Sequence, residues 1–278
     1  MATGSLNEDR GLFGPDSMIW QVNREAVVAL AGTCAILMQF AHPKVAAGVR
    51  DHSSFEIDPV GRLRRTFDLT LAWVFGSRHQ VVEAARIVNR RHNAVQGAGY
   101  SAKDPDLLMW VQATLVYSAI RAYRSFVSPL TDAEADRYYQ ETKEIGMLLG
   151  IPRDGYPATV EAFEAYLLRM IEGGDVAVGA DARRMGEVVL RPGFRWVPRV
   201  AFAPLTVLTA GLLPPALREA YQLRWGRLER NAFAVSQMVL PRLVRIAPQP
   251  IRFLPPARRA YARLRRGRPA PHRAFRTG

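Results

Sequence analysis

The chain has 278 residues, of which 49% are hydrophobic and 23% are charged. This composition is typical of a globular protein and excludes disordered and collagen-like chains. The formal net charge of +13 is concentrated at the end, because residues 230–278 hold 12 arginines and no acidic residue, whereas the preceding part holds 26 basic and 25 acidic residues.

The cysteine content and the first thirty residues indicate in which cellular compartment we expect the protein. Cys34 is a lone cysteine and cannot form an internal disulfide. The first thirty residues lack the basic start, continuous apolar run and cleavage site of a secretory signal. No window of about 18 residues is free of both charge and proline, as a lone spanning helix would require. We therefore expect a cytoplasmic protein.

In chain order, the first expected elements are helices. Residues 1–17 are polar and predict a loose arm. Residues 24–40 are apolar without strand-like alternation, which predicts a buried helix that ends before Pro43. Apolar residues then recur three or four apart over 59–75 and again over 79–95, which predicts two amphipathic helices.

The later elements carry helix-start signals. Asp104 followed by Pro105 predicts the start of a long helix that reaches residue 126, and Thr131 with Glu134 forms a capping box for the next. Further helices are expected over 159–171, 181–190 and 216–244. Because no stretch alternates like a strand, the sequence predicts an all-α fold in one domain, residues 18–247, followed by a basic tail rich in arginine and proline, residues 248–278.

Common catalytic motifs are absent. The sequence contains no P-loop, no Gly-x-Gly-x-x-Gly, no His-Glu-x-x-His and no Gly-x-Ser-x-Gly, and one cysteine cannot build a thiolate zinc cluster. Five histidines are present, of which His42 and His92 belong to apolar or amphipathic helices. Such a histidine can be a core residue or a metal ligand.

Several short strings together resemble one family. They are QFAHP at 39–43, VRDHS at 49–53, DPVGRLRRT at 58–66, VFG at 74–76, RH at 91–92, DPDLL at 104–108, WVQAT at 110–114 and FAPLTVLTAGLL at 202–213. This combination is similar to the MpaB-type oxygenase and latex-clearing rubber oxygenase catalytic domain. The resemblance covers the chain from about residue 18 to the mid-240s.

The resemblance implies a globin-like helical core around one b-type haem, and an oxygenase that acts with dioxygen on an apolar substrate. It implies His92 as the iron ligand and Arg62, Arg65 and Thr66 on the opposite, distal side. These three lie i, i+3 and i+4 on one helix face. They could hydrogen-bond dioxygen or pair with a haem propionate, or they could form a solvent-exposed stripe with Arg64.

This sequence departs from the family pattern at two positions. The rubber oxygenases carry a lysine where this chain has Arg65, and a guanidinium that stays protonated is a poor iron ligand. Relatives tend to carry histidine where this chain has Gln112, which can hydrogen-bond but does not relay protons. Gln112, Thr114 and His42 are further expected contacts of the haem, and His42 could instead cap a backbone group.

The predicted function is thus that of a haem-b-dependent oxygenase acting on an apolar small molecule, lipid or isoprenoid. The alternatives are a haem- or lipid-binding protein without turnover and a nucleic-acid binder, the latter disfavoured because the tail has few aromatic residues for base stacking. Arginines of residues 248–278 could instead hold the protein at the anionic inner face of a membrane, with Ile251, Phe253 and Leu254 entering the headgroup layer.

Overall fold

The computed structural model describes residues 11–52, 59–192 and 197–266, and these residues form an α-helical fold, as predicted. The first half contains α2 (Met18–Asn23), the 3-10 helix η1 (Ala26–Leu30), α3 (Ala31–Ala41), α4 (Pro43–His52), α5 (Pro59–Phe75), α6 (Arg78–Ala94), α7 (Pro105–Phe126) and α8 (Asp132–Leu148). The second half contains η3 (Arg153–Gly155), α9 (Val160–Glu172), α10 (Ala180–Leu190), η4 (Arg199–Phe202), α11 (Ala203–Leu212), α12 (Pro215–Ala220), α13 (Arg227–Ile246), α14 (Gln249–Arg252) and α15 (Pro255–Arg266).

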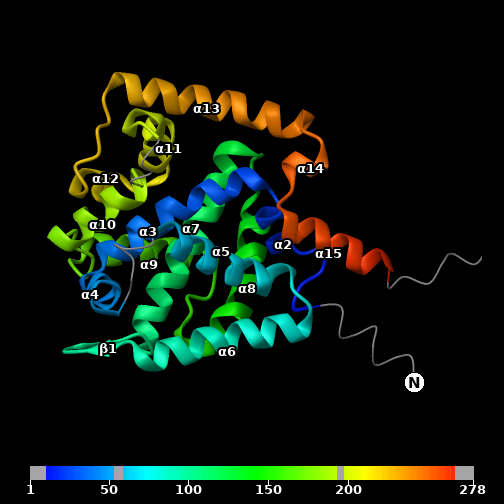
Figure 1. Ribbon diagram of the computed structural model, residues 1–278, viewed down its shortest axis with the longest axis horizontal. Helices are drawn as coiled ribbons and strands as arrows, with labels where there is room; N and C mark the ends of the chain where they lie inside the picture. The colour runs from blue at the N-terminus through cyan, green and yellow to red at the C-terminus, as the bar shows by residue number, and fades with distance from the viewer. Residues whose placement is uncertain (1–10, 53–58, 193–196, 267–278) are drawn as a thin grey trace, which may run out of the picture.

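Helix α7 is the central element, and α3 lies along it (Figure 1). Both helices bury most of their side chains, and the fully buried Trp110 of α7 donates from its indole nitrogen to the Met38 carbonyl of α3 at 3.2 Å. On the other side of α3, Tyr221 donates to the Leu37 carbonyl at 2.6 Å. A helix that is apolar on nearly all sides belongs inside a core, which is where α3 lies.

The helix starts agree with the sequence signals. Asp104 caps α7 by accepting from the Asp106 amide at 3.0 Å, and Thr131 and Glu134 form the predicted capping box of α8. Described strands are limited to one short antiparallel hairpin, β1 (Gln96–Gly97) with β2 (Tyr100–Ser101). Among the described residues, no single helix is long and apolar enough to cross a membrane. Ala26–Ala41 and Pro43–His52 together have the required length and composition, but the two segments are bent by 102°.

The predicted helix over 24–40 is interrupted. Helix α2 ends at Asn23, Arg24 and Glu25 form a short junction, and η1 separates this junction from α3. The reason is Glu25, whose completely buried carboxylate accepts two hydrogen bonds from Arg252, at 2.7 and 2.8 Å, and one from Arg24 at 3.3 Å. A buried carboxylate must be paired, and this pairing fixes the backbone at the junction.

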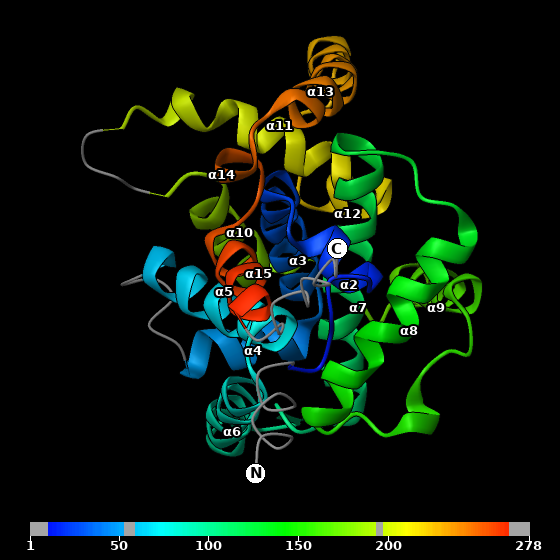
Figure 2. The same ribbon diagram turned by 90° about the vertical axis from the view of Figure 1, so that its right-hand side faces the viewer.

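Much of the basic segment expected as a tail packs against the rest of the protein. Phe253, Ala257 and Ala260 are buried, and Tyr261 makes an edge contact with Trp20 of α2, with ring centroids 5.2 Å apart. Figure 2 shows α15 beside α5 and α2. Phe253 is therefore not available to a lipid headgroup layer, in contrast to the expectation from the sequence.

Candidate functional site

Helices α5 and α6 form an antiparallel pair that carries most of the predicted site. A sharp turn at Gly76 and Ser77 joins them. A side chain at Gly76 would collide with the Ala72 carbonyl, and Ser77 and Gln80 form a capping box that starts α6. Thr66 and His92 both lie in the half of this pair that is remote from the turn.

His92 is in the last turn of α6 and is half-buried. Its Nδ1 is buried and has no hydrogen-bond partner among the residues that the structure describes. Burial, and secondarily the positive charge of Lys103, lowers the pKa of the imidazole below its ordinary value. His92 is therefore neutral at physiological pH, which is the form that binds a metal.

The predicted distal residues lie on α5. The side chain of Arg62 is outside the described part of the structure. Arg65 and Thr66 are exposed, and so is Arg64, which lies 3.9 Å from Asp68. This half of α5 thus presents a polar, solvent-accessible face rather than an apolar wall.

His42 ends α3 and is buried, 8% exposed. Its Nδ1 accepts a hydrogen bond from the Lys44 amide, 3.3 Å away, at the start of α4. Its ring centroid is 6.4 Å from that of Trp110, and burial followed by the charge of Lys44 lowers its pKa. One ring nitrogen therefore caps the backbone, which is one of the two roles that the sequence left open.

Gln112 and Thr114 are both buried in α7, but they point toward different helices. Gln112 donates to the Thr142 carbonyl of α8 at 3.0 Å. Thr114 donates to the Val111 carbonyl at 2.7 Å and accepts from Gln39 of α3 at 3.1 Å. Each connects α7 to a neighbour, so the structure does not bring these two side chains together.

The β1–β2 hairpin, which the sequence did not predict, follows His92 directly. Tyr100 donates to Asp51 at 2.8 Å, and the His52 Nε2 lies 3.0 Å from the Gln96 carbonyl. These contacts hold the hairpin against the end of α4 and so fix the chain that leaves His92. Gly97 and Gly99 are the sequence signal for such a turn.

Trp73 is a second residue that sequence reasoning did not single out. It lies two helical turns beyond Thr66 on α5 and is buried, and its indole nitrogen has no hydrogen-bond partner among the described residues. A buried indole usually has an acceptor. The α5–α6 pair therefore contains two buried, unpartnered nitrogens, one on each helix.

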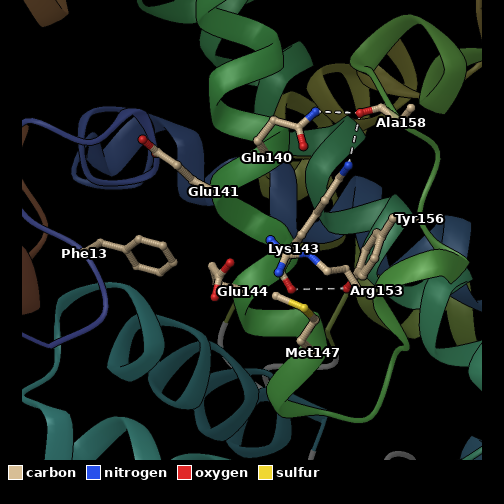
Figure 3. A pocket seen from close by; sticks show the side chains of 9 residues that line it. All are labelled: Phe13, Gln140, Glu141, Lys143, Glu144, Met147, Arg153, Tyr156 and Ala158. Atoms are coloured by element: carbon tan, nitrogen blue, oxygen red, sulfur yellow. Dashed lines mark hydrogen bonds between the residues drawn. The ribbon is translucent and has the colours of Figure 1, made fainter.

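A hollow of about 460 Å³ lies elsewhere, on the outer side of α8 (Figure 3). It is lined by Phe13, Gln140, Glu141, Lys143, Glu144, Met147, Arg153, Tyr156 and Ala158. Lys143 donates to the carbonyls of Pro157 and Ala158, at 2.9 and 3.2 Å, and lies over the Tyr139 ring. The ammonium group thus connects α8 to the following loop, and the hollow contains none of the predicted site residues.

The α5–α6 pair meets one chemical requirement of a haem protein. A b-type haem needs a single neutral imidazole on a rigid helix, and His92 offers one with a buried, unpartnered nitrogen. Within the described residues, no group of three or more His, Cys, Asp or Glu side chains is placed to hold a metal ion directly. His92 by itself has the chemistry of a haem-iron ligand.

Comparisons with known proteins identify the family of the chain. Two relatives, the uncharacterized proteins Mb2261 of Mycobacterium bovis and Rv2237 of Mycobacterium tuberculosis, are each 29% identical to it over 225 residues, which is 77% of this chain and 87% of theirs. No solved structure matches. The model of one protein family, described as ER-bound oxygenase mpaB/B′/Rubber oxygenase, catalytic domain, matches residues 20–246. The chain therefore belongs to this family of oxygenase catalytic domains.

Proposed function

We propose that the protein is a haem-b-dependent oxygenase that acts with dioxygen on an apolar small molecule, lipid or isoprenoid. The observation that carries the proposal is the buried, unpartnered Nδ1 of His92 in an oxygenase family. A buried polar atom without a partner is costly, and a bound group at this place would remove that cost.

His92 is the residue proposed to hold the iron. Its lowered pKa keeps a lone pair available on the ring across the physiological pH range. When bound, haem supplies dioxygen and one-electron chemistry that amino-acid side chains do not provide. Capping of α6 at Ser77 and attachment of β1–β2 to α4 keep the imidazole on a rigid support.

Arg62, Arg65 and Thr66 are proposed to bind and orient the anionic or polar groups on the distal side. A guanidinium donates hydrogen bonds and is a poor iron ligand, so the role proposed for Arg65 is that of a hydrogen-bond donor. Thr66 adds a hydroxyl one residue further along the same face of α5. The exposure of this face agrees better with pairing to haem propionates, which remain close to water, than with a closed dioxygen pocket.

An apolar substrate is the choice that the family description supports, since rubber is an apolar polymer. The central helices α3 and α7 supply a thick apolar wall through Leu37, Met38, Phe40 and Trp110. Such a wall excludes water from a neighbouring site. The buried His42 lies at the edge of this wall and is proposed to contact the haem through the ring nitrogen that does not accept from Lys44.

The test is spectroscopic and uses the full-length protein. We expect the purified protein to bind one haem and to absorb near 400 nm, and His92→Ala to lose stoichiometric haem. His79→Ala is the matched control, because His79 is an exposed residue at the other end of the same helix. Circular dichroism melting curves of the variants verify that each is folded.

Oxygen uptake in the presence of an isoprenoid emulsion then tests turnover. Full haem occupancy in a folded His92→Ala protein would overturn the ligand assignment. A haem-loaded protein that consumes no oxygen with any apolar substrate would instead identify a haem-binding protein without turnover.

A further inference from the structure

Helix α13 has an apolar face that points outward. Along one edge of the molecule it runs as a 20-residue helix (Figure 1), and only Glu229 and Phe233 are buried in it. Six of its large apolar residues are between 43% and 78% exposed: Leu228, Val235, Met238, Val239, Leu243 and Ile246. Four of them, at 228, 235, 239 and 246, follow the spacing of a single helical stripe. An exposed stripe of this length marks an interaction surface.

The packing of the opposite face fixes this orientation. Phe233 lies on Gly211 of α11, where any side chain would collide with its ring, and its ring also contacts Phe126 and Trp225, with centroids 6.0 and 5.8 Å away. The partly buried Ser236, Leu240 and Val244 continue the inner stripe at helical spacing. Because these buried contacts fix the rotation of α13 about its own axis, the outer apolar residues cannot turn inward.

The charges around this face are all positive after Glu229. Arg227, Arg230, Arg242 and Arg245 are exposed on α13, and the sequence contains no acidic residue from 230 to 278. Glu229 is itself buried, accepts from the Gly226 amide at 2.8 Å and pairs with Arg224 at 2.9 Å. An apolar stripe beside arginines is the pattern of a helix that lies in a membrane interface.

We propose that the outward face of α13 docks the protein on an anionic phospholipid bilayer, with the helix parallel to the membrane plane. At about 1.5 Å per residue the helix extends roughly 30 Å along the surface. Its apolar side chains enter the boundary between headgroups and acyl chains, while the long arginine side chains reach lipid phosphates. The arginines would not allow the helix to span the bilayer.

Charge distinguishes this occupant from a second copy of the chain. Two copies would each carry a formal charge of +13, and α13 offers no exposed carboxylate to pair with the arginines of a partner. An anionic bilayer supplies the missing negative charge along the whole helix. The proposal depends on the surface of α13 alone, so its test is independent of haem binding.

The experiment measures co-sedimentation of the full-length protein with vesicles of phosphatidylcholine, alone or mixed with phosphatidylglycerol. We expect binding to the anionic vesicles that weakens as salt rises, since screening shortens the reach of the arginines. A triple variant, Val235→Ser, Val239→Ser and Ile246→Ser, should reduce binding by roughly tenfold or more, because each change removes apolar area that would be buried in lipid. Its melting temperature should not fall, since all three side chains are exposed.

A second variant, Arg242→Gln with Arg245→Gln, tests the charge. We expect about a fivefold loss of binding for each arginine and a shallower salt dependence. The controls carry the same kinds of change on other helices: the double variant Val82→Ser with Leu168→Ser for exposed apolar residues, and Arg86→Gln with Arg90→Gln for exposed arginines. Both controls should bind as the original protein does.

Equal vesicle binding by the original protein and both α13 variants would overturn the proposal. So would a dimer in sedimentation velocity that the triple variant dissolves, together with no binding to anionic vesicles, because that result would assign the face to a second copy.

Discussion

His42 and His92 both titrate below the ordinary histidine value of 6.5, because burial disfavours the charged ring. Between pH 6.5 and the lowered value, the unfolded chain binds protons that the folded chain does not. The contribution of these two neutral histidines to folding stability is therefore fully present above pH 6.5, and it is lost as the pH drops through this window.

A substitution at His42 separates its share of this effect. In His42→Asn the amide oxygen can still accept from the Lys44 amide, as the Nδ1 does at 3.3 Å, but the side chain no longer titrates. We expect the drop in melting temperature between pH 7 and pH 5 to become smaller in this variant, as measured by circular dichroism. His79→Asn should keep the full drop, and an unchanged drop in His42→Asn would contradict the assignment.

Single residues also show which features of the candidate site the sequence could predict and which it could not. Spacing placed Gln112 and Thr114 on one helix, and residues two apart on a helix diverge by about 200°. Their different partners, Thr142 and Gln39, agree with this geometry. The unpartnered Nδ1 of His92 could not be predicted, because spacing along a helix does not show which polar groups of the fold lie within reach of a buried ring nitrogen.

At the scale of elements, Glu25, which directly precedes η1, connects the start of the fold to Arg252 of α14. Glu25 has no exposed surface, and Arg252 supplies two of its three hydrogen bonds. The Leu254 amide adds a backbone bond to the Arg24 carbonyl at 2.9 Å, and Arg24 lies over the Phe253 ring. The carboxylate therefore fastens the C-terminal helices to the start of the chain.

Removing the arginine should cost more than an ordinary surface change. Arg252→Met leaves the buried Glu25 carboxylate with Arg24 alone, and breaking a buried ion pair costs about 3 kcal/mol. We expect a loss of that size in urea unfolding. Arg259→Met, an exposed arginine of α15, should change stability by less than about 0.5 kcal/mol. Equal losses in the two variants would argue against the role of Glu25.

Elements with local signals were predicted well, and those fixed by distant contacts were not. The bounds Pro59–Phe75 of α5 match the prediction, because a proline at the first turn and Gly76 at the end are both local signals. The break at Glu25 was missed, since its cause lies 227 residues further along the chain. The apolar spacing in α13 could not say which of its faces α11 would cover.

At the scale of the whole molecule, the two ends of the described chain pack together. Trp20 of α2 contacts Phe75 and Tyr261, with ring centroids 5.3 and 5.2 Å away, and Arg263 donates to the Phe75 carbonyl at 2.7 Å. Helix α15 thus covers residues of α2 and α5, and Arg252 and Arg263 of the basic segment are used in contacts within the protein.

Two truncations test this packing. A chain that ends at Ala247 loses the buried Phe253, Ala257 and Ala260 and leaves Glu25 without Arg252, so we expect a loss on the order of 5 kcal/mol in urea unfolding. A chain that ends at Arg266 keeps every contact described above and should unfold like the full chain. If the two truncated proteins were equally stable, the C-terminal helices would not belong to the core.

The separation between Glu25 and Arg252 also has a consequence for biosynthesis. A ribosome that adds about 5 to 20 residues per second needs on the order of 10 to 45 seconds to make the 227 residues between them. During that time the Glu25 carboxylate has only Arg24 as an ion-pair partner, and Trp20 of α2 and Phe75 of α5 lack their contacts with α15. The nascent chain therefore reaches its final packing only late in translation, after Arg252 has been made.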